Sequence, residues 1–107
     1  MISTLQKNAT EEAVIRRIID DLDLPETVKE YRLRLTNDSF GDPAVYLLFL
    51  MSDDLKIEEF LSETGRIRQV LTDAILDSPE TERWPFPAFS LEGEQRELER
   101  KYPGTTW

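Results

Sequence analysis

Two runs of residues with strand-like patterns are separated by a segment rich in turn-forming residues. In the first run, Tyr31 to Thr36, apolar and polar residues alternate, which is typical of a strand with one buried and one solvated face. The second run, Ala44 to Met51, is apolar on both faces and therefore predicts a central strand. Residues 37–43 between them are rich in Asn, Asp, Gly and Pro, which favour turns. The pattern predicts a β-hairpin that begins near Val28 or Glu30.

A helical pattern of apolar residues precedes the hairpin. Asn8 or Thr10 can cap this helix, and Pro25 ends it because the residue before a proline is pushed out of the helical region. The predicted buried stripe consists of Val14, Ile15, Ile18, Ile19 and Leu22. Residues 1–8 show no periodicity and are predicted to form a flexible arm.

A longer helical pattern follows the hairpin. Ser52-Asp53-Asp54 supplies capping oxygens and negative charge for a helix over residues 53–77, which Ser78-Pro79 ends. Gly65 leaves open whether this helix is continuous or broken. The predicted buried stripe consists of Ile57, Phe60, Leu61, Thr64, Ile67, Val70, Leu71, Ala74 and Ile75, and it continues to about Leu76.

The last third of the chain mixes prolines with aromatic residues. Because proline cannot donate a ladder hydrogen bond, we expect a short strand at the sheet edge, centred on residues 88–91. Residues 92–102 then form a highly charged helix with a weak apolar stripe, which docks on the sheet or on a partner. Pro103-Gly104 ends this helix, and residues 103–107 form a tail.

These elements predict one α+β domain over residues 1–107, a two-layer sandwich in the order α-β-β-α-β-α. Its three-stranded sheet carries the first and the long helix on one face; if the third strand runs parallel to a hairpin strand, the long helix is the crossover. This order resembles the BolA-like and type II KH arrangements over about residues 10–101. The functional motifs of those families do not carry over, because the chain has neither the BolA-type histidine nor a Gly-x-x-Gly loop.

Composition narrows the chemistry that the chain can perform. It has no cysteine and no histidine, which excludes disulfides, thiolate metal sites, cysteine nucleophiles and imidazole bases. The net charge of −9 disfavours nucleic acid and anionic lipid and favours basic partners. The longest apolar run is far shorter than the roughly 20 residues that span a bilayer. With no visible secretory signal at the N-terminus, we expect a soluble cytoplasmic protein.

Two groups of polar residues are candidate sites. Asp38 and Asp42 could present carboxylates to a divalent cation, but the same residue types are favoured in turns, so we predict a turn with a positive φ at Gly41 and no metal site. Arg32 and Arg34 share a strand face and could bind a phosphate or a partner's carboxylate, or pair with acidic neighbours on an adjacent strand or the C-terminal helix. A second basic cluster consists of Arg66 and Arg68. The two clusters together could form a small positive island on the surface.

Aromatic residues are the other candidates for an interface. Trp84, Phe86 and Phe89 either close the end of a small core or bind a partner, and Trp107 either folds back or offers an exposed anchor. We therefore expect a small, acidic, non-enzymatic module without cofactor or metal that binds another protein, such as an accessory protein, an inhibitor or an antitoxin-like regulator. Homodimerisation or strand addition at the edge near Ala88 is a further option. The alternatives are a KH-like nucleic-acid-binding module and a small carboxylate- or metal-dependent enzyme.

Overall fold

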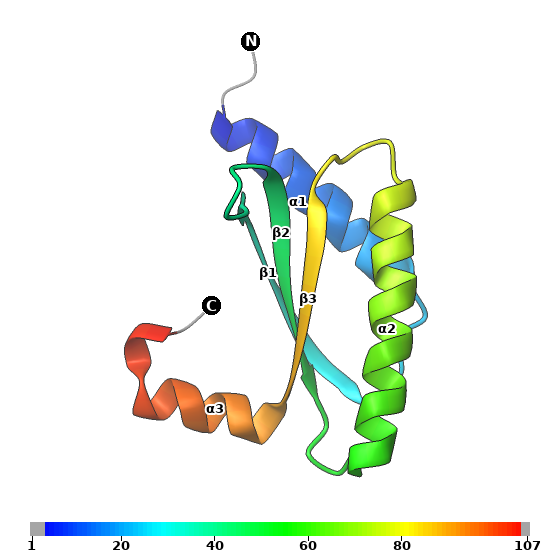
Figure 1. The fold of residues 1–107 in the computed structure, drawn as a ribbon, viewed down its shortest axis with the longest axis vertical. Coiled ribbons are helices and arrows are strands. Elements are labelled where there is room, and N and C mark those ends of the chain that lie inside the picture. Colours follow the sequence, from blue (N-terminus) through cyan, green and yellow to red (C-terminus); the bar gives the residue numbers. More distant parts are fainter. Residues whose placement is uncertain (1–3, 106–107) are drawn as a thin grey trace.

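The computed structural model describes residues 4–105 of the chain, which form three helices and one three-stranded sheet (Figure 1). The predicted order α-β-β-α-β-α and the α+β class are confirmed. In chain order the elements are α1 (Thr4–Asp21), β1 (Val28–Asn37), β2 (Pro43–Met51), α2 (Ile57–Asp77), β3 (Trp84–Leu91), α3 (Glu92–Lys101) and the short 3-10 helix η1 (Pro103–Thr105).

The sheet has the order β1-β2-β3, so that the entirely apolar strand lies in the centre as predicted. β1 and β2 form an antiparallel hairpin in which Leu33 lies opposite Leu47. β3 runs parallel to β2, with Pro87 at the position next to Leu47. Parallel neighbours cannot be joined by a tight turn, so α2 forms the crossover between them.

The strand β3 lies at the sheet edge as expected, but it is longer than predicted, because it begins at Trp84 and includes two prolines. In a parallel pair, alternate residues direct both backbone groups toward the neighbouring strand. Pro85 and Pro87 are among the intervening residues, whose backbone groups point away from β2. Their missing N–H groups therefore lie on the free edge of the sheet and cost no hydrogen bond between β2 and β3. The carbonyl of Pro87 accepts a hydrogen bond from Arg68 Nη1 at 3.2 Å, which further blocks this edge. Strand addition along β3 is therefore disfavoured.

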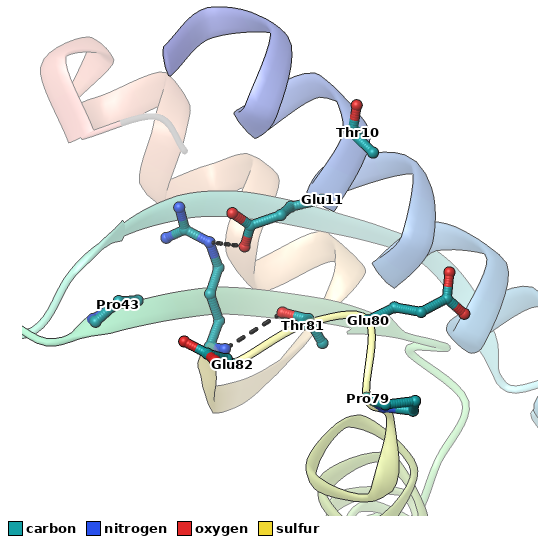
Figure 2. Close-up of a pocket in the computed structure, with 8 residues that line it drawn as sticks. Thr10, Glu11, Pro43, Pro79, Glu80, Thr81 and Glu82 are labelled. Atoms are coloured by element: carbon teal, nitrogen blue, oxygen red, sulfur yellow. Dashed lines mark hydrogen bonds and ion pairs between the residues drawn. The ribbon is translucent and has the colours of Figure 1, made fainter. Parts of the chain in front are cut away.

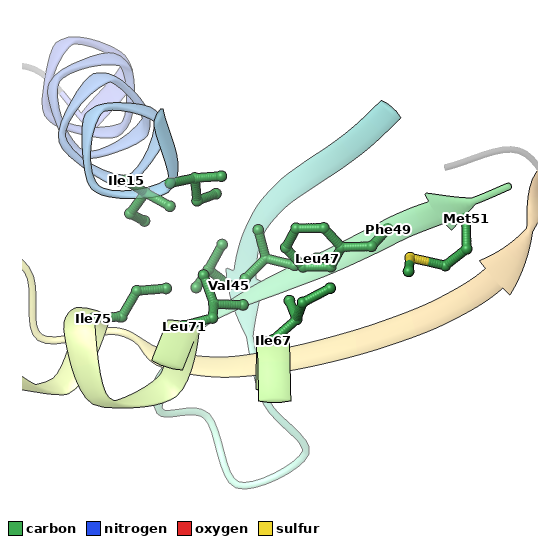
Figure 3. Close-up of a cluster of buried hydrophobic side chains, with 9 residues drawn as sticks. Ile15, Val45, Leu47, Phe49, Met51, Ile67, Leu71 and Ile75 are labelled. Atoms are coloured by element: carbon green, nitrogen blue, oxygen red, sulfur yellow. The ribbon is translucent and has the colours of Figure 1, made fainter. Parts of the chain in front are cut away.

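The core lies between the sheet and the two longer helices (Figure 3). Alternate residues of β2 point to this side and meet apolar residues of α1 and α2, and every member of the cluster is at most 1% exposed. The cluster consists of Ile15, Ile19, Val45, Leu47, Phe49, Met51, Ile67, Leu71 and Ile75. The predicted stripe of α1 is confirmed in this core. Four predicted positions of the α2 stripe are instead exposed: Ile57, Leu61, Val70 and Leu76.

Helix boundaries differ from expectation at two N-termini. α1 begins at Thr4 rather than at the caps expected at Asn8 or Thr10, so part of the expected arm is helical. α2 begins at Ile57 and runs without a break through Gly65. Asp53 does not cap α2: its carboxylate accepts a hydrogen bond from the backbone N–H of Gly93, in the first turn of α3, at 2.9 Å. A carboxylate is stabilised at a helix N-terminus. Here the stabilising helix is α3, which lies far from Asp53 in the sequence, and not α2, which follows it.

The third helix packs on the opposite side of the sheet from α2, where it covers one end of the second face (Figure 1). It follows β3 without a loop, and its buried residue Gln95 faces the sheet end where Leu48 and Leu50 are also buried. Gly93 permits a close approach at this junction, since a Cβ there would lie 2.9 Å from the Asp53 carboxylate. The C-terminal helix therefore docks on its own domain, one of the two alternatives that the sequence left open.

Candidate functional site

The second face of the sheet, opposite the core, is only partly covered. Along β2, the residues on this face alternate with the core residues, and α3 covers the end that carries Leu48 and Leu50. At the other end, the register places Arg34, Tyr46 and Phe86 side by side across the three strands. Trp84 is two residues from Phe86 and shares its face. The part of this face that α3 does not cover is therefore lined by aromatic rings and one arginine.

These four residues form a surface that we call the aromatic patch. The rings of Tyr46 and Phe86 are stacked, with centroids 5.1 Å apart and planes inclined by 19°. The guanidinium carbon of Arg34 lies 5.7 Å from the Tyr46 ring centroid, within the range of a cation–π contact. Trp84 is 52% exposed although it belongs to a strand. The sequence singled out Arg34, Trp84 and Phe86, but missed Tyr46, the only residue with a polar tip in an otherwise aliphatic and phenyl strand.

Arg32, the other arginine of this face, is engaged by acidic neighbours. Its guanidinium donates to Glu30 on its own strand at 2.8 Å and to Glu99 on α3. The hydrogen bond from Arg32, followed by one from Gln95, holds the pKa of the Glu99 carboxyl below its ordinary value. The prediction that Arg32 pairs with an acidic residue of a docked C-terminal helix is therefore confirmed. Its charge is used to hold α3 and is not presented by the aromatic patch.

The four candidate arginines do not form one stripe. Arg32 and Arg34 lie on the second face of the sheet, whereas Arg66 and Arg68 belong to α2, which covers the first face. Arg68 contacts the β3 edge, since its guanidinium carbon lies 5.2 Å from the centroid of the Phe89 ring. Phe89 in turn stacks on Phe49 at the margin of the core, with centroids 5.4 Å apart. The convergence that a KH-like nucleic-acid site would need is absent from these positions.

A pocket of about 430 Å³ lies between the end of α1 and the loop before β3 (Figure 2). Arg83 Nε donates to Glu11 at 2.6 Å, and Arg83 Nη1 donates to the carbonyl oxygens of Thr36 and Ala44 at 2.9 and 3.0 Å. The two charged side chains are only 10% and 14% exposed. Arg83 therefore joins α1 to both hairpin strands. No local pattern indicated this role, because the three partners come from distant segments.

Two acidic residues that could serve a metal or an acid–base pair, Asp38 and Glu80, have structural partners. Asp38 Oδ1 accepts hydrogen bonds from the backbone N–H groups of Phe40 and Asp42, at 2.9 and 3.0 Å, and so organises the hairpin turn. Gly41 has a φ of 84°, as predicted. In the pocket, Glu80 pairs with Arg17. Within residues 4–105, the structure shows no cluster of three or more acidic side chains placed to hold a metal ion.

Trp107, the remaining candidate, lies outside the described residues. No helix in the described part of the chain is both long enough and apolar enough to cross a membrane. Comparison with protein-family models finds no match, and searches of curated proteins and of solved structures find no significant similarity either. The class that the fold defines is a small α+β protein.

Proposed function

We propose that this chain is a small non-catalytic binding module that docks another protein on the aromatic patch. The observation that carries this proposal is Trp84, which is half exposed on a strand beside the stacked Tyr46 and Phe86 rings and Arg34. Trp, Tyr and Arg supply most of the binding energy at protein interfaces. Because strands hold these side chains in a fixed array, little conformational entropy is lost when a partner covers them.

The charge of the chain indicates the chemistry of the partner. With 22 acidic and 13 basic residues, the protein attracts a basic surface over a distance of roughly the Debye length, about 10 Å at 0.1 M salt. The aromatic patch then supplies short-range contact, and the net negative charge of the protein supplies steering. This combination suits an accessory protein, an inhibitor or an antitoxin-like regulator whose target is basic.

Single-stranded nucleic acid is the competing occupant. Exposed aromatic rings and an arginine on a sheet face can also stack on unpaired bases. Two observations favour a protein instead: the net charge opposes a polyanion, and Arg32 is already neutralised by Glu30 and Glu99. We therefore treat nucleic acid as an outcome of the test.

Affinity capture from the native lysate, with and without nuclease, tests the proposal when wild type is compared with Trp84→Ala. Phe40→Ala is the matched control, because Phe40 is 88% exposed at the hairpin tip and is not one of the four residues of the patch. We expect one stoichiometric protein to survive nuclease with wild type and with Phe40→Ala, and to be lost with Trp84→Ala. With the purified partner, Trp84→Ala should weaken binding by about 30-fold, the equivalent of about 2 kcal/mol.

The opposite results have defined meanings. Equal recovery by Trp84→Ala and wild type would remove the aromatic patch as the binding site. Recovery that nuclease abolishes, together with an affinity that falls steeply with salt, would replace the protein partner with nucleic acid. Circular dichroism of each variant confirms that the fold is retained.

A further inference from the structure

The two outer strands of the sheet differ in what their backbones offer to another chain. On β3, Pro85 and Pro87 remove the outward N–H groups, and the Pro87 carbonyl accepts a hydrogen bond from Arg68. β1 is the other outer strand, with ten residues and no proline. Its pairing with β2 is shifted only at its start, between Val28 and Glu30. Because proteins usually protect a sheet edge with proline, a bulge or a covering element, the edge of β1 is a candidate for strand addition.

The hairpin turn shows which residues of β1 face this edge. The backbone N–H of Asp38 donates to the carbonyl of Asp42 at 2.8 Å, so these two residues form a hydrogen-bonded pair. Bonded and non-bonded pairs alternate along an antiparallel ladder. Counting back from Asp38, the backbone of Arg34 bonds to β2, whereas the backbones of Leu33 and Leu35 point to the free edge. Within residues 4–105, no other backbone or side-chain group bonds to these outward groups.

The side chains of the same two leucines form an incomplete margin of the core. Leu33 and Leu35 pack against the buried cluster but are themselves only partly buried. Their neighbours on β2, Leu47 and Val45, are completely buried. A strand added beside β1 would place every second side chain next to these leucines and would complete their burial. The margin therefore favours an extended segment that is apolar at alternate positions.

The other face of an added strand would meet the aromatic patch. The register aligns Phe86, Tyr46 and Arg34 in one row across the sheet, and Arg34 is the last member of the row before the free edge. A fourth strand would add one more side chain to this row. An aromatic ring suits that position because it can stack on a guanidinium group, whereas a basic side chain would be repelled. The edge of β1 and the aromatic patch are therefore parts of one continuous surface.

We propose that the partner docked on the aromatic patch contributes an extended segment that pairs with the free edge of β1 as a fourth strand. The segment carries an aromatic side chain beside Arg34, between two apolar side chains that cover Leu33 and Leu35. This inference rests on the proposed function, since it describes how the same partner is held. Backbone hydrogen bonds supply affinity, and the row of rings and the leucine margin supply specificity.

A peptide probe tests strand addition directly. Binders of the wild-type protein are selected from a displayed library of random peptides of about ten residues, which is within the usual length of a strand. We expect the selected peptides to share an aromatic residue between two apolar residues. Methylation of single backbone nitrogens should weaken binding at every second residue of the peptide and spare the residues between them. Equal losses along the peptide, or a library that yields no binder, overturn the proposal.

A proline on β1 tests the same hydrogen bonds from the side of the protein. Leu35→Pro removes an outward N–H without breaking a bond to β2, as Pro85 and Pro87 already do on β3. Leu35→Ala is the matched control, because it shortens the side chain but keeps the N–H. We expect Leu35→Pro to bind the selected peptide about tenfold more weakly than Leu35→Ala does. Equal affinities of the two variants contradict strand addition.

Amide hydrogen exchange of the wild type needs no variant and separates this inference from the proposed function. In the free protein, the amides of Leu33 and Leu35 should exchange faster than that of Arg34, and the selected peptide should protect both. Binding that Trp84→Ala abolishes, but that leaves these leucine amides unprotected, would retain the patch and overturn strand addition. Protection that persists in Trp84→Ala would retain strand addition and remove the patch as the binding site.

The free protein provides the last control, because a second copy of this chain is the competing occupant of the edge. Protection of Leu33 and Leu35 without peptide, rising with protein concentration, would assign the edge to a second copy and overturn the proposal. Unprotected amides at every concentration of the free protein, together with protection by the peptide, support the partner segment.

Discussion

Side chains of β2 contribute to both faces of the sheet, but different helices cover the two faces and to different extents. On the core face, β2 presents residues that two apolar helix surfaces bury completely. On the second face, a short charged helix covers one end through Arg32, Glu99 and Gln95, while the other end displays Tyr46 and Trp84. If the proposed function holds, stability and recognition are separated by the thickness of one sheet. Substitutions on one face should therefore change unfolding, and substitutions on the other should change binding.

The largest effect on stability should come from the centre of the core face. Phe49 is fully buried and stacks on Phe89, so Phe49→Ala leaves a cavity and loses a ring contact. We expect the free energy of unfolding to fall by about 4 kcal/mol, measured by urea denaturation. A loss below about 1 kcal/mol would mean that the core repacks easily and that the contrast between the faces is weaker than the structure indicates.

The next effect should come from the ion pair that joins α1 to the hairpin. Arg83→Ala leaves Glu11 without its buried partner and removes the donor to two strand carbonyls, which should cost about 3 kcal/mol of unfolding free energy. The double variant Glu11→Leu, Arg83→Met should recover much of that loss. Arg17→Ala, which removes an exposed pair with Glu80, is the control and should leave stability nearly unchanged. Equal losses for the two arginines would contradict the role assigned to Arg83.

A smaller and local effect should follow from the contact that holds α3. Because Arg32 lowers the pKa of Glu99, the carboxylate stabilises docking fully above its unfolded pKa, and this contribution is lost as pH falls through the lower folded value. We expect the protection factors of the α3 amides against hydrogen exchange to fall in acid below about pH 4, before those of the core amides fall.

The matching variant is Arg32→Ala, which should accelerate α3 exchange already at neutral pH and flatten its acid dependence. The core amides of β2 should keep the wild-type protection in this variant. If the amides of α3 and β2 exchange together under all conditions, the third helix belongs to the same cooperative unit as the core, and the second face is not independently labile.

The smallest effect on stability should come from the aromatic patch itself. Because Trp84 is 52% exposed, Trp84→Ala should change the free energy of unfolding by no more than about 1 kcal/mol, although it should abolish partner capture. Thermal and urea unfolding beside Phe49→Ala give the direct comparison. A loss of several kcal/mol would show that Trp84 closes the core, the alternative that its aromatic character left open.

Local patterns predicted the elements because each depends on neighbouring residues. The alternation of Tyr31, Leu33 and Leu35 with polar residues identified β1 and its faces, and the unbroken apolar run identified β2 as central. Ile57 and Leu61 were assigned to the core wrongly, because a helical stripe specifies a side of the helix but not the width of the sheet beneath it. A three-stranded sheet buries only the narrow stripe of Thr64, Ile67, Leu71 and Ile75.

The candidate site was predictable only in part, because its geometry depends on contacts between distant segments. Arg34 and Phe86 were singled out separately, but their alignment with Tyr46 follows from the parallel register of β3, which no local pattern encodes. The contact between Asp53 and Gly93 likewise joins the loop before α2 to the first turn of α3, which lies far away in the sequence. The prediction that Asp53 caps the long helix was wrong, because capping chemistry is local and could not identify α3 as the helix that its carboxylate contacts.

The parallel pairing of β3 with β2 has a consequence for synthesis of the chain. The central strand acquires its second neighbour only after a crossover helix of 21 residues has been made and has packed on the hairpin. Such non-local pairing closes a long loop and slows folding relative to the local hairpin. During translation, one edge of the most apolar strand therefore stays unpaired until residue 91 has left the ribosome. This interval is when a chaperone would gain most by binding the nascent protein.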